Sequence, residues 1–113
     1  MNPIIPRLDR KCGRWLRSFV TECRICLRPL DDTAQVSHCF RRSYLQTRWD
    51  VKNCWLAHNG CHRRWEKMNG EERKEMMVSR LGQEGYDELC RKAYSNKKWS
   101  PDELKKLEEG FEI

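Results

Sequence analysis

The N-terminal part of the chain predicts an amphipathic helix. Between residues 8 and 20, apolar side chains recur at i, i+4, i+7, i+8, i+11 and i+12, the spacing of one helical face. They are Leu8, Cys12, Trp15, Leu16, Phe19 and Val20. The opposite face is basic, so we expect a helix over residues 8–22 with one side against a core. Pro3 and Pro6 oppose helix formation, and we expect residues 1–6 to form a frayed tail.

The centre of the chain predicts two short strands followed by a helix. Residues 33–40 and 51–56 have the pattern of short strands, and the loop between them is basic and aromatic. A knuckle then leads into a helix that we expect to begin at His62. Residues 23–68 are therefore predicted to form a small ββα core.

The remainder of the chain, residues 69–113, predicts three helices. Asn69 with Glu72, and Ser100 with Glu103, have the spacing of capping boxes, and each pair precedes a stretch with apolar residues at helical spacing. A further helical stripe lies between them, at residues 86–94. The apolar stripes of these helices fit either a core or the interface of a homodimer, and we expect core. The fold class is accordingly α+β, in a single domain over residues 1–113.

Composition indicates that the chain needs more than a hydrophobic core to fold. It has 113 residues, of which 38% are hydrophobic and 35% charged, so the core is thin. Five Trp residues argue against disorder, and seven Cys with three His offer metal ligands. No apolar run is long enough for a membrane helix, and no secretory signal is evident at the N-terminus. We therefore expect a cytoplasmic protein whose cysteines are metal ligands or free thiols.

The positive charge is concentrated in the first part of the chain. The net charge is +6, but residues 1–65 carry 13 Lys and Arg against 5 Asp and Glu, and 11 of those 13 are Arg. Arginine is favoured where phosphates are bound through paired hydrogen bonds. This asymmetry indicates nucleic acid as a partner, although a merely solubilising excess of charge is the alternative.

Two pairs of metal-ligating residues have the spacing of a zinc site. Cys23 and Cys26 are separated by two residues, as are His58 and Cys61. Such pairs lie on tight knuckles that converge on one tetrahedral zinc, and structural zinc contributes free energy of folding. The alternative is a set of buried free cysteines. Four cysteines are left without a role, namely Cys12, Cys39, Cys54 and Cys90.

The remaining histidines suggest a nuclease. His38 at the end of the first strand, Asn53 in the second and His62 at the start of the helix have the order of the HNH motif of ββα-metal nucleases. Cleavage of a phosphodiester needs a base near neutral pKa to activate water, and a divalent cation to neutralise charge. We expect His38 to be the base and His62 a ligand of the cation. Asn53 is either a second ligand or the residue that orients the His38 loop.

The chain resembles the NinG, or Rap, recombination nucleases of lambdoid phages. The resemblance covers about residues 8–109 and is carried by Cys23-x2-Cys26, residues 37–42, residues 47–53, His58-x2-Cys61-His62 and residues 97–104. Three features depart from the family. The family usually has Cys-x2-Cys-Asn where this chain has His58-x2-Cys61-His62, and its N-terminal region is usually longer. In addition, Ser37 stands where many HNH enzymes have an acidic metal ligand.

The resemblance implies an endonuclease that acts on branched DNA, such as Holliday junctions and D-loops, in a bacterial host. Mg²⁺ or Mn²⁺ would be the catalytic cation and Zn²⁺ the structural one. Candidate phosphate contacts are Arg41, Arg42, Arg48, Lys52, Arg63 and Arg64. Trp49 and Trp55 either stack on exposed bases or, as we expect, pack beside the zinc site.

Two other functions are compatible with the sequence. A zinc-stabilised DNA-binding module without cleavage activity would keep the basic residues, and the lack of an acidic residue before His38 favours it slightly. A structural zinc protein could use the basic face to bind a partner protein. The presence of both His38 and His62 favours the endonuclease, because a pure binder requires neither.

Overall fold

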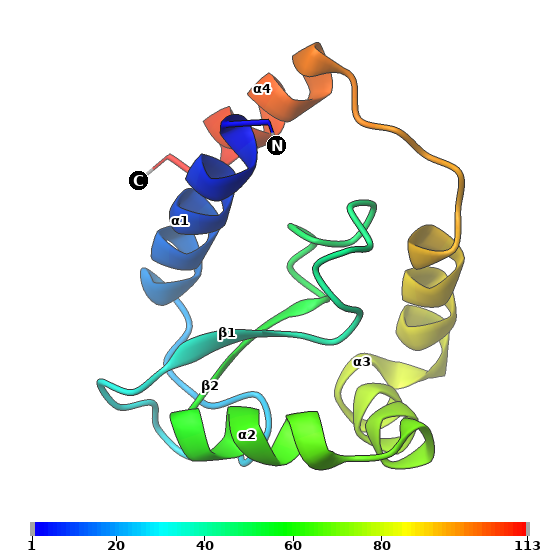
Figure 1. Cartoon of the computed structure of the whole chain (residues 1–113). Coiled ribbons are helices and arrows are strands. Elements are labelled where there is room, and N and C mark those ends of the chain that lie inside the picture. The colour runs from blue at the N-terminus through cyan, green and yellow to red at the C-terminus, as the bar shows by residue number, and fades with distance from the viewer. Residues whose placement is uncertain (1, 113) are drawn as a thin grey trace.

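A two-stranded antiparallel sheet lies at the centre of the protein, in a computed structural model that describes residues 2–112. Strand β1 (Gln35–His38) pairs with β2 (Cys54–Ala57), with Ser37 opposite Trp55 and His38 opposite Cys54. The described residues also contain α1 (Ile4–Arg17), α2 (Asn59–Lys67), α3 (Gly70–Ala93) and α4 (Pro101–Gly110). The fold is α+β, and α2 follows β2 beneath the hairpin (Figure 1).

Strand β2 separates two hydrophobic clusters, which explains why all four of its residues are buried. Successive side chains of a strand point to opposite faces. Cys54 and Leu56 join the cluster formed by α1, α4 and Trp49, whereas Trp55 and Ala57 join a second cluster with the α2 and α3 side chains and the Cys23 knuckle. The sheet thus connects the terminal helices to the part of the chain that contains Cys23 and Cys61.

The first helix is longer at its start, and shorter at its end, than the apolar pattern predicts. It begins at Ile4 rather than Leu8, so the prediction of a frayed tail over residues 1–6 is wrong for residues 4–6. Pro6 is tolerated because it lies in the first turn, where backbone N–H groups have no partner within the helix. Side by side with α4 (Figure 1), α1 forms salt bridges from Lys11 to Glu108 and to Glu112, at 3.2 and 2.8 Å.

The strands and α2 also differ from their predicted bounds. Both strands are shorter, and α2 begins at Asn59, so His62 lies within its first turns rather than at its start. The two helices predicted between residues 69 and 94 are both present and meet at a kink at Gly82, and α3 covers the pair. Gly82 has φ 76° and ψ 163°, a conformation that is nearly restricted to glycine.

Both predicted capping boxes are present. The Asn69 side chain accepts a hydrogen bond from the backbone N–H of Glu72, and Glu72 accepts one from the N–H of Asn69. Ser100 and Glu103 make the same exchange at the start of α4. Within residues 2–112, none of the helices is both long and apolar enough to cross a membrane.

Candidate functional site

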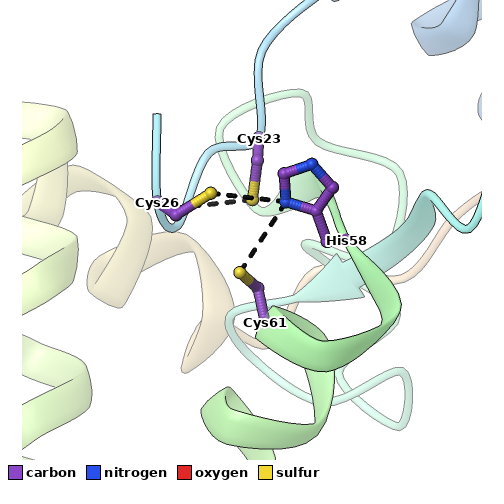
Figure 2. A group of neighbouring side chains, drawn as sticks. All are labelled: Cys23, Cys26, His58 and Cys61. Atoms are coloured by element: carbon purple, nitrogen blue, oxygen red, sulfur yellow. Dashed lines mark hydrogen bonds between the residues drawn. The ribbon is translucent and has the colours of Figure 1, made fainter. Parts of the chain in front are cut away.

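The four predicted zinc ligands converge on one point. The ligand atoms of Cys23, Cys26, His58 and Cys61 all lie within 4.8 Å of one another, and Figure 2 shows the four side chains facing a common centre. Three thiols and one imidazole are a donor set that zinc accepts in structural sites. Among residues 2–112, this is the one group of three or more His, Cys, Asp or Glu side chains arranged to hold a metal ion.

Local backbone hydrogen bonds shape the first half of this cluster. The N–H of Cys23 donates to the carbonyl of Arg28 at 2.8 Å, and the N–H of Leu27 donates to the carbonyl of Cys23 at 2.8 Å. Leu27 has a positive φ of 64°, which closes the tight turn that two ligands separated by two residues require. The N–H of Arg24 donates to the carbonyl of Leu56, so the knuckle is attached to β2.

The second half of the cluster comes from the start of α2. His58 is the residue before the helix, and Cys61 lies in its first turn. The Nε2 of His58 lies 2.7 Å from the carbonyl of Pro29, to which it donates, and this bond raises the pKa of His58. The Nδ1 therefore faces the thiols, at 3.3 Å from Cys26 Sγ and 3.8 Å from Cys61 Sγ. A carbonyl that orients a ligating histidine in this way is typical of metal sites.

Two of the thiols, Cys26 and Cys61, have pKa values shifted in opposite directions. A hydrogen bond from the backbone of Arg28 lowers the pKa of Cys26 to about 6, despite partial burial. Burial, together with Cys26 and Cys23, raises the pKa of Cys61 to about 11. Because thiolates so close together repel one another, a bound cation is needed for Cys61 to ionise beside Cys26 at neutral pH.

A basic cleft of about 800 Å³ is lined by both remaining histidines and by none of the four residues of this cluster. His38 reaches it from β1 and His62 from α2. The cleft is bordered by six arginines and two acidic residues, Asp9 and Glu66. The arginines are Arg10, Arg17, Arg41, Arg42, Arg48 and Arg73. Such a concentration of positive charge around two imidazoles attracts a polyanion.

His38 is held by the backbone of the loop that connects the two strands. Its Nε2 lies 3.0 Å from the carbonyl oxygen of Arg48, which can only accept a hydrogen bond. Nε2 therefore carries the proton, and Nδ1 keeps a lone pair when the ring is neutral. Burial lowers the pKa of His38, against the opposing effect of the hydrogen bond to Arg48. The ring is thus neutral at pH 7 and can accept a proton.

Asn53 orients the loop after His38 and is not available to a metal ion. It is fully buried, its Oδ1 accepts from the N–H of Phe40 at 2.7 Å, and its Nδ2 donates to the carbonyls of Phe40 and Thr47. Of the two roles expected for Asn53, these hydrogen bonds support the one that orients the His38 loop and not the one as a ligand of the cation. A buried amide with every polar atom bonded to backbone fixes loop geometry instead.

His62 has a polar neighbour at each ring nitrogen. Its Nδ1 lies 2.9 Å from the hydroxyl of Ser37, and its Nε2 lies 3.3 Å from a carboxylate oxygen of Glu66, one turn further along α2. Because the Ser37 hydroxyl can donate or accept, it tolerates either tautomer of His62. Nε2 of His62 and the Glu66 carboxylate are thus two adjacent groups at the cleft that could ligate a metal ion.

The six predicted phosphate contacts lie in three different surroundings. Arg41 and Arg42 are exposed and line the cleft. Arg63 and Arg64 line a separate pocket beside the metal cluster. The remaining two candidates, Arg48 and Lys52, both have partners within the protein. Lys52 lies 3.6 Å from the carboxylate of Glu88. The guanidinium of Arg48 donates hydrogen bonds to Asp9 and to the carbonyl of Arg42.

Trp49 and Trp55 are core residues, with exposed fractions of 4% and 2%. The expectation that they pack rather than stack on bases is confirmed, although Trp49 joins the cluster of the terminal helices and Trp55 the one around the metal knuckle. All seven cysteines are free thiols, and Cys12 and Cys54 are buried in the same cluster.

Asp9 and Glu66 are two cleft residues that the sequence reasoning missed. Glu66 follows His62 by four residues, a spacing that places both on one helical face and was available as a signal. Asp9 carries no such signal, because its partners Arg48 and Trp49 are about forty residues away in sequence. Comparisons with protein-family models, curated proteins and solved structures found no match for this chain.

Proposed function

We propose that this chain is a zinc-stabilised, metal-dependent DNA endonuclease of the HNH, or ββα-metal, type. The observation that carries the proposal is the position of His38 and His62, which line one arginine-rich cleft from a strand and from the following helix. The strand, strand and helix of this arrangement are β1, β2 and α2, and the metal cluster lies at the start of α2.

His38 would activate the attacking water. Its neutral Nδ1 is the free acceptor, because Nε2 donates to the carbonyl of Arg48. A general base works best when it is deprotonated at the operating pH and held rigidly. Burial supplies the first property by lowering the pKa of His38, and the hydrogen bonds of Asn53 to the adjoining loop supply the second.

His62 and Glu66 are the residues that would hold a divalent cation. Glu66 thus takes the place that Asn53 had among the expected ligands. Mg²⁺ keeps several waters and is bound through one or two carboxylates together with substrate phosphate. An imidazole nitrogen beside one carboxylate oxygen fits that sparse requirement. When bound, such a cation stabilises negative charge on the scissile phosphate and the leaving oxygen. Ser37 supports the site by fixing the His62 ring.

The arginines of the cleft would bind the DNA backbone. Phosphate contacts position a nucleic acid without reading its sequence, which suits an enzyme that recognises the shape of its substrate. Arg41 and Arg42 are the best placed, because they are exposed beside His38. Branched DNA, such as Holliday junctions and D-loops in phage recombination, is the substrate that the resemblance to NinG nucleases implies.

A panel of labelled DNA substrates tests this proposal. The purified zinc-loaded protein would be incubated with four-way junction, flap, duplex and single-stranded DNA, with and without Mg²⁺. We expect Mg²⁺-dependent cleavage that favours the junction or flap. Mg²⁺ should be omitted rather than chelated, since a chelator would also remove structural zinc. Failure to cleave any of the four substrates in Mg²⁺ or Mn²⁺ would contradict the proposal.

A zinc-stabilised DNA-binding module is the second candidate. The observation in its favour is that the cleft offers a cation two side chains, whereas the zinc cluster offers four. In that case the protein would bind structured DNA with the same arginines and leave it intact. The substrate panel separates the two functions, because binding without cleavage identifies the module.

A further inference from the structure

Three aromatic side chains form a cluster at the surface, outside the cleft. Phe40, Tyr44 and Tyr94 contact one another edge to face, with ring centroids 5.6 to 5.9 Å apart and interplanar angles of 76 to 85°. Tyr94 is 67% exposed, the largest value among the exposed hydrophobic side chains of the described residues. We call these three residues the aromatic platform.

The aromatic platform is fixed to its surroundings by hydrogen bonds. The backbone N–H of Phe40 donates to Oδ1 of the buried Asn53, and the backbone carbonyl of Phe40 accepts from Nδ2 of the same side chain. The loop that carries Tyr44 is joined to the end of α3 by a bond from Gln46 Nε2 to the carbonyl of Ser95, at 2.7 Å. Rigid aromatic rings bind a flat ligand at little cost in conformational entropy.

The platform is continuous with the positively charged border of the cleft. Phe40 is followed directly by Arg41 and Arg42, which line the cleft with His38. Arg91 lies in the last turn of α3, three residues before Tyr94, the residue that follows the helix. Within residues 2–112, Arg41, Arg42 and Arg91 take part in no salt bridge, which leaves their charges for an anionic partner.

We propose that the aromatic platform stacks unpaired bases of a DNA strand whose backbone continues over Arg41 and Arg42 into the cleft. This inference rests on the proposed function and narrows its substrate class to DNA with a single-stranded segment next to the site of cleavage. Exposed aromatic rings beside arginines are the elements with which proteins bind single strands, because every base has a stacking face. A fully paired duplex keeps its bases inside the helix and gains nothing from the platform.

Binding of tailed and blunt DNA tests the platform independently of cleavage. The His38→Ala protein, loaded with zinc and without Mg²⁺, would be titrated against a labelled duplex with a single-stranded tail and against the same duplex with blunt ends. We expect tighter binding of the tailed duplex. Tyr94→Ala and Tyr44→Ala should each weaken that binding about tenfold, the effect of losing one stacked base. Affinity for the blunt duplex should stay the same.

Two further variants distinguish stacking from a structural role. Tyr94→Trp should keep the preference for the tail, because the larger ring also stacks. Phe19→Ala is the matched control, since Phe19 is an aromatic residue that is 52% exposed but contacts Trp15 on the N-terminal side of the molecule. It should leave both affinities unchanged. Zinc content and thermal melting of each variant would show that the fold is retained.

The outcomes separate this inference from the proposed function. If Mg²⁺-dependent cleavage occurs but Tyr94→Ala and Tyr44→Ala bind the tailed duplex as tightly as their parent, the platform inference is wrong and the endonuclease proposal stands. If no substrate is cleaved but the tail preference exists and depends on Tyr94, the platform is correct as a binding site. Equal affinity of the parent for tailed and blunt duplexes overturns the inference directly.

Discussion

Asp9 on α1 binds the guanidinium of Arg48 with both carboxylate oxygens. Oδ1 lies 3.0 Å from Nε and Oδ2 lies 2.6 Å from Nη2, and Oδ1 also accepts from the indole N–H of Trp49 at 2.8 Å. The carbonyl of the same Arg48 holds the His38 ring at 3.0 Å. Burial raises the pKa of Asp9, but its hydrogen bonds to Arg48 and Trp49 outweigh burial and keep the pKa below its ordinary value. An N-terminal helix thus positions the proposed base.

Removal of the Asp9 charge should impair catalysis through His38. We expect Asp9→Asn to lower the single-turnover rate of cleavage by roughly 10- to 100-fold, since small displacements of a catalytic group have effects of that size. The negative charge of Asp9 also raises the pKa of His38. The variant should therefore shift the acid limb of the pH–rate profile to lower pH, an effect that general destabilisation would not produce.

The control for this substitution is Asp87→Asn, which removes an aspartate that accepts a hydrogen bond from Gln83 on the surface of α3. It should leave the rate and its pH dependence unchanged. An Asp9→Asn protein with the parental rate and profile would show that α1 does not position His38.

The pH dependence of cleavage follows from the environment of His38. The base must be neutral, and burial places its pKa below the ordinary value of 6.5 despite the hydrogen bond to Arg48. The rate should therefore rise with pH below 6.5 and be level from pH 7 upward. The measurement is the single-turnover rate at saturating DNA and Mg²⁺. A midpoint of the rise above pH 6.5 would be incompatible with this assignment.

Loss of one thiol of the metal cluster should unfold the central part of the protein. Cys61→Ser removes a ligand that also belongs to the buried cluster with Trp55 and Trp65. We expect the variant to lose zinc in native mass spectrometry and the far-UV circular dichroism signal of a folded protein, because the cluster replaces a larger core. Cys90→Ser, a thiol on α3 outside the cluster, should keep one zinc and its melting temperature. Absence of zinc from the parent protein would refute the site.

The kink in α3 should depend on Gly82. Its φ of 76° strains any residue with a Cβ, although no atom stands within 4 Å of where the Cβ would lie. Gly82→Ala should lower the free energy of unfolding by about 1–3 kcal/mol. Gly70→Ala, in the first turn of the same helix and equally unhindered, should be neutral or stabilise by up to about 1 kcal/mol. Urea titrations compare the two, and equal stabilities would contradict this account of the kink.

The sequence predicted those features that depend on local spacing. The Cys/His group that could hold zinc was predictable because Cys23 with Cys26, and His58 with Cys61, each have the spacing of a knuckle. The capping boxes at Asn69 and Ser100 depend on side chains three residues apart, and both formed as expected. Strand and helix bounds were less accurate, because hydrogen bonds and not apolar pattern set them.

Features that depend on tertiary contacts were not predictable. The sequence alone did not decide between the two roles of Asn53. Its partners Phe40 and Thr47 lie in the loop between the strands, and the path of that loop depends on these same hydrogen bonds. Asp9 was overlooked because the packing of α1 against the loop at Arg48 brings it to the cleft. The break within α3 was predictable as two helices, but the sharp bend at Gly82 depends on its backbone conformation, which the apolar pattern does not reveal.

Cleavage of a synthetic four-way junction by the parent and by His38→Ala tests the central claim most directly. Both proteins would carry zinc, and DNA affinity would be measured alongside cleavage in Mg²⁺. We predict that the parent cuts the junction, and that His38→Ala binds it with nearly the same affinity but cuts at least about 100-fold more slowly, as expected for loss of a general base. Equal cleavage by the two proteins would contradict the assignment of His38 as the base, and with it the proposed active site.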